Sequence, residues 1–466
     1  MTTTQPATID APTLNKQLRA TFESGRTRPL EWRRRQLDGL RRMMEEGDAE
    51  MVRALAEDLG RPAMEAFAAD IGHAKGELRH LAKHVGRWMK PRKVGVPLTV
   101  APAKAWTQPE PLGVALVIAP WNYPVQLLIE PLAAALAAGN CVVAKPSELA
   151  PATSAVLARL LPQYVDPEAV VVVEGGVPET TALLAERWDH IFFTGSTAVG
   201  RVVAEAAAKH LTPTVLELGG KSPTYVHASA DIEVTARRIA WGKFLNAGQT
   251  CIAPDYVLAD RSIRDRLVDA LAAQVGEFYG PDPKASTSLG RIVNDRHMAR
   301  LRGLLDAGAG TVVTGGTVDE GSRYLAPTIT VDPSPDSPVM QEEIFGPILP
   351  VLAVDGPEAA RDFITARPKP LALYVFGNDD AAVESVVDGT SSGGVCVNQT
   401  LMHLLPNDLP FGGVGDSGMG AYHGKAGFDA FSHHKSVLRK PVRPDLKLLY
   451  PPYKASVEKL VRRILK

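Results

Sequence analysis

Short apolar runs alternate with helical patterns between residues 114 and 218, and this alternation limits the fold more than any other feature of the chain. We expect strands at Val114–Ala119, Cys141–Ala144, Val170–Val173, Ile191–Phe193 and Thr214–Leu218. Apolar strands separated by helices form a parallel sheet with helices covering both faces. The chain therefore predicts an α/β fold.

The rest of the chain adds further parts. Residues 14–88 repeat Leu, Met and Ala at the spacing of amphipathic helices. Within them, the run 33–35 (RRR) is expected on a solvated helix face. The stretch Lys93–Pro111 is rich in Val, Thr and Pro and predicts a β-hairpin. After an expected helix at Ile232–Phe244, a second mixed α/β region continues to about Pro410.

The composition excludes several classes of function. The formal net charge is -1, so no overall field attracts nucleic acid, and we expect no nucleic-acid partner. The cysteines Cys141, Cys251 and Cys396 lack the spacing of a disulfide framework or a zinc site, so we expect no metal and a reducing, cytoplasmic location. The N-terminal residues lack the pattern of a signal peptide. No integral membrane segment is expected, because a Glu-Pro pair interrupts the apolar stretch Val125–Gly139 and favours a buried helix.

Loops that follow strand ends are the candidate ligand sites, because open parallel sheets bind ligands beyond the carboxyl ends of their strands. The loop Gly195–Gly200 (GSTAVG) opens a helix whose N-terminus can bind a phosphate, although a purely structural turn has the same pattern. The loop Lys145–Glu148 (KPSE) offers a Lys and a Glu to ribose hydroxyls, although an ordinary surface ion pair looks the same.

A rigid asparagine lies in the loop Pro120–Pro124 (PWNYP), where two prolines stiffen the chain. The side-chain amide of Asn122 can donate a hydrogen bond to an oxyanion, and donors of this kind contribute about 3–4 kcal/mol to a reaction barrier. Asparagine in such a loop is also a common turn former.

Cys251 carries the strongest chemical signal. Isolated cysteines are usually small core hydrophobes, and Cys141 and Cys396 fit that description because they lie in apolar runs. Cys251 instead follows small and polar residues at 246–250, which predict an exposed loop after a helix. Reactive cysteines need partial exposure and a lowered thiol pKa. If Glu217 faces the same cleft, the thiol can attack a carbonyl and the carboxylate can activate water.

Several motifs, each weak alone, occur in a fixed order along the chain: Pro120–Pro124, Phe193–Gly200, Leu216–Pro223, Gly248–Cys251, Glu342–Pro347 and Pro410–Gly413. Together they resemble the NAD(P)-dependent aldehyde dehydrogenase superfamily, from about residue 110 to 435. The segments Trp241–Phe244, Ala253–Tyr256 and Tyr450–Pro452 resemble its class 3 branch, which includes fatty, aromatic and coniferyl-type aldehyde dehydrogenases.

The resemblance implies a Rossmann-like parallel-sheet cofactor domain, a second α/β catalytic domain and a small β bridging unit for oligomerisation. The corresponding ranges are 1–92 and 112–218 for the dinucleotide-binding domain, 219–410 for the catalytic domain, 93–111 and 411–440 for the bridging unit, and 441–466 for a C-terminal tail. We expect the boundary between the two large units just after Leu218. A homodimer is the expected assembly.

The resemblance also implies roles for individual residues. Cys251 is the expected nucleophile and Glu217 the general base, while Asn122 and the backbone N–H of Cys251 form the oxyanion hole. The expected NAD-binding residues are Trp121, Lys145, Glu148, Gly195, Ser196, Val199, Leu218, Glu343 and Phe345. The expected walls of the aldehyde tunnel are Tyr123, Trp241, Leu245 and Phe411.

Within that cofactor set, Lys145 and Glu148 would bind the adenosine ribose, Ser196 and its helix the pyrophosphate, and Glu343 the nicotinamide ribose. Phe345 would pack near the nicotinamide ring. Glu148 repels a 2′-phosphate and so favours NAD, but class 3 relatives often accept NADP as well.

The implied activity is oxidation of a medium or long aliphatic aldehyde, or an aromatic one, to its acid. The expected route passes through a cysteine thiohemiacetal and a thioester, which water activated by Glu217 hydrolyses. One alternative is a CoA-acylating relative, which has less need of such a base. Another is a catalytically inactive binding or structural homologue, against which the intact set of Asn122, Glu217 and Cys251 argues.

The C-terminal stretch Ser456–Lys466 has one apolar and one basic helical face. Such a pattern is compatible with a helix on a membrane surface. We favour docking on the protein itself or on a partner subunit, or a loosely ordered tail.

Overall fold

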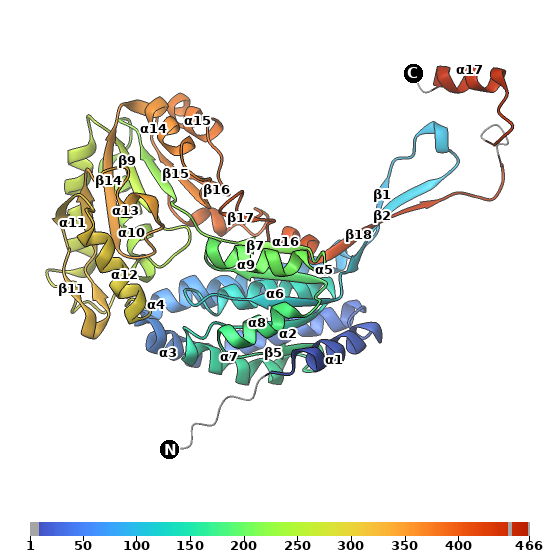
Figure 1. The fold of residues 1–466 in the computed structure, drawn as a ribbon, viewed down its shortest axis with the longest axis horizontal. Coiled ribbons are helices and arrows are strands. Elements are labelled where there is room, and N and C mark those ends of the chain that lie inside the picture. Colours follow the sequence, from blue (N-terminus) through green and yellow to red (C-terminus); the bar gives the residue numbers. More distant parts are fainter. Residues whose placement is uncertain (1–8, 446–449, 465–466) are drawn as a thin grey trace.

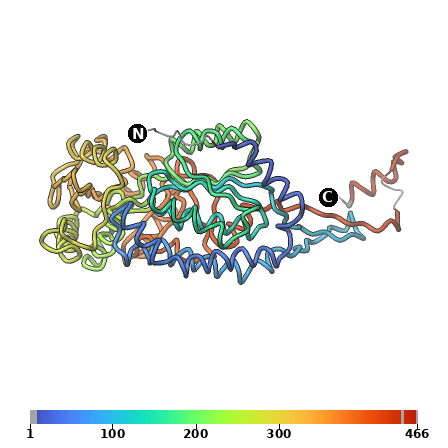
Figure 2. Tube along the Cα trace, turned by 90° about the horizontal axis from the view of Figure 1, so that it is seen from below, coloured from blue at the N-terminus to red at the C-terminus, as the bar shows by residue number. Residues whose placement is uncertain are grey.

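The structure is a computed structural model that describes residues 9–445 and 450–464. Two α/β lobes lie side by side, and a narrow antiparallel sheet projects from one of them (Figure 1). A second view shows the same elongated outline, with the projecting sheet at the opposite end from the lobe coloured yellow and orange (Figure 2). The predicted α/β fold with Rossmann-like parallel sheets is confirmed.

The first lobe contains a six-stranded sheet in the order β17-β7-β6-β3-β4-β5. All of its strands are parallel except β17, which runs antiparallel to β7. The strands are β3 (Val114–Ile118), β4 (Cys141–Lys145), β5 (Val170–Val172), β6 (His190–Thr194), β7 (Thr214–Glu217) and β17 (Gly418–Met419). The five runs predicted as strands therefore form one sheet, and their carboxyl ends lie along one edge.

Helices cover this sheet on both faces, as its apolar strands require. Four come from the crossovers: α6 (Gln126–Ala138), α7 (Pro151–Tyr164), α8 (Val177–Ala185) and α9 (Thr197–Ala208). The N-terminal region supplies α1 (Ala11–Glu23), α2 (Leu30–Glu46), α3 (Asp48–Leu59), the single turn α4 (Ala63–Glu65), a π-helical segment (Ala66–Ile71) and α5 (Gly72–Trp88), and α16 (Gly424–Ala430) also packs here.

The apolar helix predicted near Val125–Gly139 is α6, and every residue of it is buried. It ends at Gly139, whose φ of 93° is a left-handed conformation that glycine adopts without strain. Arg33 lies directly below this end and donates a hydrogen bond of 3.0 Å to the carbonyl of Ala137. The expected solvated position of Arg33 is therefore wrong, because the C-terminal carbonyls of a buried helix attract a cation.

The second lobe contains a seven-stranded sheet in the order β10-β13-β14-β9-β8-β15-β16, parallel except for β10. Its strands are β8 (Pro223–Val226), β9 (Tyr256–Asp260), β10 (Thr311–Thr314), β13 (Thr328–Val331), β14 (Ile348–Val354), β15 (Ala372–Phe376) and β16 (Gly394–Val397). Its helices are α10 (Ile232–Phe244), α11 (Arg264–Tyr279), α12 (Asp295–Asp306), α13 (Pro338–Gln341), α14 (Gly356–Thr365) and α15 (Asp380–Asp388), with a small ladder of β11 (Val318–Asp319) and β12 (Tyr324–Leu325).

The projecting sheet is antiparallel and consists of β1 (Arg92–Val94), β2 (Lys104–Pro111) and β18 (Ser432–Arg439). The hairpin predicted at Lys93–Pro111 is thus confirmed as the β1–β2 pair. Within the range 411–440, only β18 joins this sheet, whereas β17 pairs with β7. The division of the chain into domains, with a boundary after Leu218, stays a proposal.

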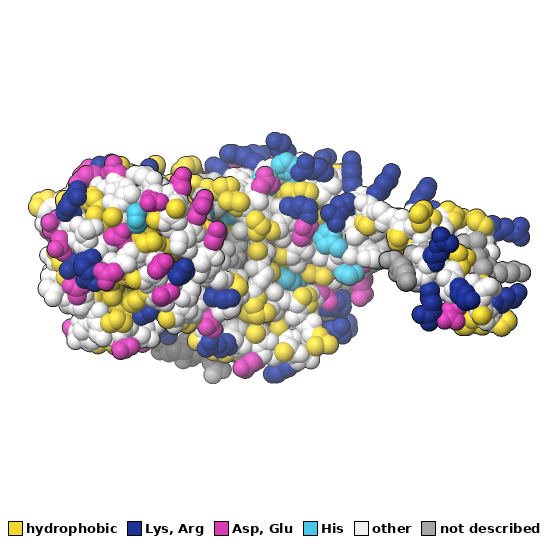
Figure 3. All heavy atoms as spheres, turned by 90° about the horizontal axis from the view of Figure 1, so that it is seen from above, with side chains coloured by type: hydrophobic (Ala, Val, Ile, Leu, Met, Phe, Trp, Pro, Cys, Tyr) yellow, Lys and Arg dark blue, Asp and Glu magenta, His cyan; other side chains and the backbone are white. Residues whose placement is uncertain are grey.

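The last helix, α17 (Ala455–Ile464), lies beyond the tip of the projecting sheet (Figure 1). Its side chains from 455 to 463 are largely exposed, and Lys and Arg gather around this end of the molecule (Figure 3). Residues 1–8 of the N-terminal region and 465–466 of the amphipathic stretch lie outside the described residues. Within 9–445 and 450–464, no helix combines the length and apolar character needed to cross a bilayer.

Candidate active site

Cys251 follows α10 through a tight turn at residues 245–248. Asn246 and Ala247 have φ angles of 53° and 52°, which non-glycine residues seldom adopt. At Gly248, with a φ of 75°, an added Cβ would lie 2.3 Å from the carbonyl oxygen of Gly346. The turn is therefore packed closely against the neighbouring loop, and it holds Cys251 where the two lobes face each other.

Two cavities meet at Cys251. A cleft of about 580 Å³ lies beyond the carboxyl ends of β3, β6 and β7, and a cavity of about 380 Å³ lies on the other side among α5, α6 and α10. Among the residues that the structure describes, Cys251 alone lines both. A ligand in one space and a ligand in the other can thus both reach this sulfur.

The cleft collects most of the residues predicted to hold a cofactor. It is lined by Trp121, Gly195, Ser196, Leu218, Glu343 and Phe345, together with the three predicted catalytic residues Asn122, Glu217 and Cys251. The ring of Phe345 meets the ring of Trp121 edge-on, with 5.3 Å between their centres. These residues come from the loops after three neighbouring parallel strands and from the loop before β14, so the fold itself brings them together.

Three predicted cofactor residues lie outside the lining of this cleft. Val199 is in the first turn of α9, where its backbone N–H donates to the Ser196 hydroxyl at 3.4 Å. The loop with Lys145 and Glu148 follows β4, which pairs with β3, so it lies further along the same sheet edge. The buried Lys145 ammonium donates to the carbonyls of Pro146 at 2.8 Å and Gly175 at 2.6 Å, and lies 3.9 Å from the Glu148 carboxylate.

The cleft has features that fit a phosphate and a ribose. Ser196 caps α9, whose free backbone N–H groups face the cleft end of the helix. Glu343 is half-buried, and its buried Oε1 has no hydrogen-bond partner among the described residues. Gly219 lies under that carboxylate, and an added Cβ there would come 2.3 Å from Glu343 Oε2. A ligand hydroxyl is the natural partner for such an unsatisfied buried oxygen.

Glu217 closes the inner end of the cleft at the last residue of β7. It is 2% exposed, and neither carboxyl oxygen has a hydrogen-bond partner in the described part of the chain. Burial raises the pKa of Glu217 well above its ordinary value. Burial therefore opposes the ionised form of Glu217, and a positive charge nearby would favour it.

The loop before Cys251 differs from its prediction, because residues 246–250 are buried rather than exposed. The side chain of Cys251 is partly exposed, at the junction of two cavities. Burial, followed by the negative charges of Glu343 and Glu217, raises the pKa of Cys251 to about 12. Loss of water and two nearby carboxyl groups both oppose formation of a thiolate. The thiolate must therefore be stabilised by something that enters the site.

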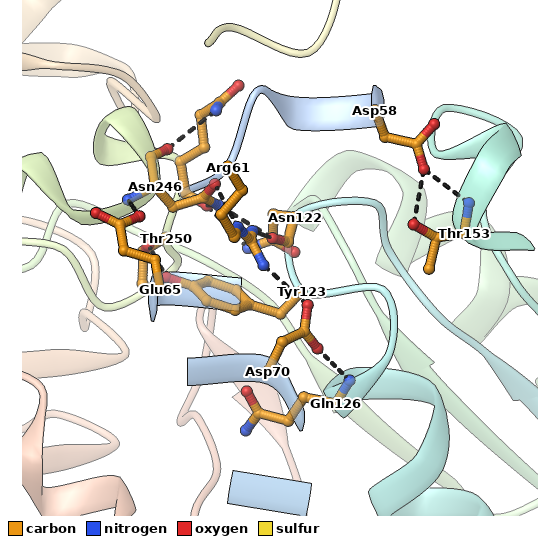
Figure 4. Close-up of polar contacts among 11 residues, drawn as sticks. Asp58, Arg61, Glu65, Asp70, Asn122, Tyr123, Gln126, Thr153, Asn246 and Thr250 are labelled. Carbon is orange, nitrogen blue, oxygen red and sulfur yellow. Dashed lines mark hydrogen bonds and ion pairs between the residues drawn. The ribbon is translucent and has the colours of Figure 1, made fainter. Parts of the chain in front are cut away.

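Arg61 connects the two loops that carry Asn122 and Cys251, and the sequence analysis missed it (Figure 4). Its side chain is fully buried and pairs with Asp70 at 2.8 Å. One guanidinium nitrogen donates to the backbone oxygen of Asn122, and another donates to Asn246 Oδ1 at 3.1 Å. The guanidinium also lies over the ring of Tyr123, 4.6 Å from its centre. The sequence signal was faint: an arginine between Gly60 and Pro62.

Further hydrogen bonds tie the same loops directly to each other (Figure 4). The side-chain amide of Asn122 donates to the carbonyl of Gln249 at 3.1 Å, and that of Asn246 donates to the carbonyl of Asn122 at 3.0 Å. The hydroxyls of Tyr123 and Thr250 are 2.7 Å apart. The two loops come from different lobes, so this network fixes the distance between Asn122 and Cys251.

The second cavity is largely apolar. All four residues predicted for the aldehyde tunnel line it, namely Tyr123, Trp241, Leu245 and Phe411, and Leu127, Ile252, Leu401 and Leu405 extend the apolar wall. Polar side chains that the sequence analysis did not select also face it: Glu65, His73, Gln126 and His423. None of these has a recognisable spacing in the sequence, since they lie on four separate segments.

No group of three or more His, Cys, Asp or Glu side chains able to hold a metal ion occurs within 9–445 and 450–464. His433 and His434, adjacent in the sequence, are exposed on β18.

Comparisons with known proteins agree with this geometry. The model of the aldehyde dehydrogenase family matches residues 5–437. A rat "aldehyde dehydrogenase, dimeric NADP-preferring" is 50% identical over 95% of this chain and 98% of its own length. Mouse "aldehyde dehydrogenase family 3 member A2" is 50% identical over 94% of this chain and 91% of its own.

Solved structures show the same likeness. The substrate-bound state of AldH from Staphylococcus aureus superimposes with a TM-score of 0.95 at 43% identity, covering 98% of this chain and 99% of that one. An indole-3-acetaldehyde dehydrogenase in complex with NAD+ has a TM-score of 0.85 at 28% identity, covering 93% of this chain and 89% of that one.

Proposed function

The chain belongs to the class 3 branch of the aldehyde dehydrogenase family and oxidises aldehydes with NAD(P), and we propose that Cys251 is the atom on which this oxidation takes place. One observation carries the proposal: of the described residues, Cys251 alone lines both cavities, and Glu217 lines the cleft beside it. The aldehyde reaches the sulfur from the apolar side, and the cofactor reaches it from the cleft.

In the first half of the reaction, the Cys251 sulfur adds to the aldehyde carbon and forms a thiohemiacetal. The carbonyl oxygen becomes an oxyanion, and the side-chain amide of Asn122 with the backbone N–H of Cys251 stabilises it. NAD(P), when bound, accepts the hydride and brings a positive charge into the cleft. Loss of the hydride leaves a thioester on Cys251.

In the second half, Glu217 removes a proton from a water molecule, which attacks the thioester and releases the carboxylic acid. Both Cys251 and Glu217 have raised pKa values in the protein alone, so a positive charge nearby favours the loss of a proton from each. Because that positive charge comes with the cofactor, a reactive thiolate forms only when the cofactor is bound.

We propose the cofactor contacts on the same basis. Ser196, with Gly195 and Val199 at the start of α9, binds the pyrophosphate, while Glu343 binds a ribose through the oxygen that has no protein partner. Trp121, Leu218 and Phe345 flank the nicotinamide, and Lys145 with Glu148 binds the adenosine ribose. Glu148 is 45% exposed in its side chain, so its charge faces solvent and disfavours a 2′-phosphate without excluding it.

The size and lining of the second cavity support medium or long aliphatic aldehydes, or aromatic ones, as substrates. We also propose a cytoplasmic homodimer. Support for the dimer comes from the projecting sheet, which leaves Val94, Leu98 and Leu438 exposed, and from the "dimeric" rat relative. Light scattering of the purified protein tests the dimer, and a monomeric mass would contradict it.

Trapping the thioester tests the central proposal. The Glu217→Gln variant, mixed with NAD and an aldehyde and quenched in acid, is expected to carry one acyl group on the peptide that contains Cys251. Wild-type enzyme should carry much less, because it hydrolyses the thioester. Turnover with no acylated Cys251, or an acyl group on Cys141 or Cys396 instead, would contradict the proposal.

A parallel reaction with added coenzyme A separates hydrolysis from acyl transfer. We expect free acid as the product in both reactions, because Glu217 is in place to activate water.

A further inference from the structure

A buried carboxylate, Glu130, lies behind the wall of the aldehyde cavity and has no part in the mechanism proposed above. Glu130 on α6 is 1% exposed, and two imidazoles face its two oxygens. His73 Nδ1 on α5 lies 2.5 Å from Glu130 Oε1, and His423 Nε2 lies 3.2 Å from Glu130 Oε2. Burial raises the pKa of Glu130, but the two imidazoles outweigh it and lower that pKa to about 2. Glu130 is therefore ionised.

A purely structural role does not explain why these charged side chains are buried together. The segment around His423 is already anchored by Glu77, which accepts hydrogen bonds from the backbone N–H of Gly424 at 2.7 Å and from the Asn407 amide at 2.5 Å. Buried ion pairs contribute little to stability compared with apolar side chains of similar volume. A charged cluster in the wall of an otherwise apolar cavity therefore points to a role in the cavity.

The cluster presents unused hydrogen-bonding capacity to the cavity. His73, Gln126 and His423 all line it. The Gln126 amide nitrogen contacts Glu130 at 3.3 Å and His73 at 3.1 Å, while its Oε1 accepts no hydrogen bond from any described residue. His73 Nε2 reaches only the carbonyl of Leu404, at a long 3.4 Å, whereas His423 Nε2 is directed at Glu130. A ligand group that both donates and accepts would satisfy this wall.

The charges select a neutral ligand group over an anionic one. Two carboxylates, Glu77 and Glu130, face two imidazoles, His73 and His423, so even a fully ionised cluster has no net positive charge. Glu65 adds a third carboxyl group to the same cavity. A carboxylate at the far end of the aldehyde would thus gain no compensating positive charge. A hydroxyl there can donate to Gln126 Oε1 and accept from an imidazole N–H.

We propose that Gln126, His73 and His423 form a recognition site for a hydroxyl group on the aldehyde, away from its reacting end. Hydroxylated aldehydes, such as ω-hydroxyalkanals, are then the preferred substrate class. The inference rests on the proposed function, which places the aldehyde in this cavity with its carbonyl at Cys251.

The expected discrimination follows from the cost of burying a hydroxyl. In a purely apolar cavity a buried hydroxyl without a partner costs roughly 1–3 kcal/mol, so an apolar tunnel would disfavour hydroxyalkanals. A wall that pairs the hydroxyl removes this cost. Removing the wall's polar atoms should therefore lower activity toward the hydroxyalkanal and leave activity toward the plain alkanal almost unchanged.

Matched substrates provide the test. The kcat/KM values for hexanal, octanal and decanal are compared with those for 6-hydroxyhexanal, 8-hydroxyoctanal and 10-hydroxydecanal, which gives a hydroxyl-to-alkyl ratio for each length. In Gln126→Leu and His73→Phe, we expect this ratio to fall at least about tenfold for the preferred length. In Leu127→Ala, a change in the apolar wall of the same cavity, the ratio should stay within about twofold of wild type.

A binding measurement keeps the test independent of turnover and of folding. Calorimetry with octanoate and 8-hydroxyoctanoate, the corresponding product acids, should show tighter binding of the hydroxylated acid to wild type and loss of that preference in Gln126→Leu. Equal ratios in wild type and both variants would overturn the inference, while continued oxidation of plain alkanals would leave the role of Cys251 intact. Failure to oxidise any aldehyde would instead contradict the proposed function.

Discussion

The cleft proposed for the cofactor and the cavity proposed for the aldehyde share one of the described residues, Cys251, but they are built in different ways. The cleft lies at the carboxyl ends of parallel strands, and its residues come in short contiguous segments such as Trp121–Asn122 and Glu217–Gly219. The cavity lies between helices, and its residues are scattered over five segments from Met64 to His423.

This difference explains which groups can be recognised from sequence. A loop after an apolar strand has a defined position in a parallel sheet, so a polar residue in that loop can be assigned to the ligand edge. A polar residue on an amphipathic helix has no such marker, because it resembles the solvated residues around it. His73 on α5 could not be recognised from the sequence for this reason.

Replacing the shared residue gives the largest effect. In Cys251→Ala, aldehyde oxidation should fall by about 10⁴-fold or more, as expected when a nucleophile is removed. Cofactor binding, measured by fluorescence titration, should stay close to wild type, because the walls of the cleft are unchanged. If Cys251→Ala still oxidised aldehydes, the Cys251 sulfur would not be the nucleophile.

Replacing Arg61 tests the connection between the Asn122 loop and the Cys251 loop, because Arg61 bonds to both loops but lines neither space. Arg61→Met leaves Asp70 unpaired in the interior, which costs about 3–5 kcal/mol of stability by chemical denaturation. It also releases the Asn122 loop, so kcat/KM should fall roughly 10²-fold, toward the loss in Asn122→Ala.

The double variant Arg61→Met, Asp70→Asn separates the two roles of Arg61. It should recover much of the stability, since no buried charge remains unpaired, but it should not recover kcat. Recovery of both would mean that Arg61 serves the fold alone.

The acidic side of the pH profile of kcat tests Glu217, which lines the cleft and not the apolar cavity. Because burial raises the pKa of Glu217, the base is protonated below that pKa, and kcat for hydrolysis should fall about tenfold for each pH unit of further acidification. Above that pKa the base is ionised and kcat should level off. The same assay on Glu217→Gln should show a low rate without this limb, and an unchanged limb would assign the titration to another group.

The smallest expected effect concerns the outer end of the cleft. In Glu148→Gln, the kcat/KM for NADP relative to NAD should rise by about tenfold, because one repulsive charge near the 2′-phosphate is removed. The preference among aldehydes should be unaffected, since Glu148 lies on the cofactor side. A shift in aldehyde preference would show that the two spaces are not separate.

The sequence predicted the strands of the first sheet, the hairpin and the family, because apolar runs and strand-end motifs are local signals. It failed where burial decides the outcome. Arg33 belongs to a basic run typical of a solvated face, yet it lies under the end of α6. The raised pKa of Cys251 likewise depends first on burial and then on Glu343, which is distant in sequence and close in space.

Of the described residues, Cys251 alone lines both spaces, so under the proposed function the aldehyde and the cofactor approach one sulfur from opposite sides. The product acid would then be able to depart while the reduced nucleotide still occupies the cleft. Product acid would compete with aldehyde for the apolar cavity and leave the cleft open to the cofactor.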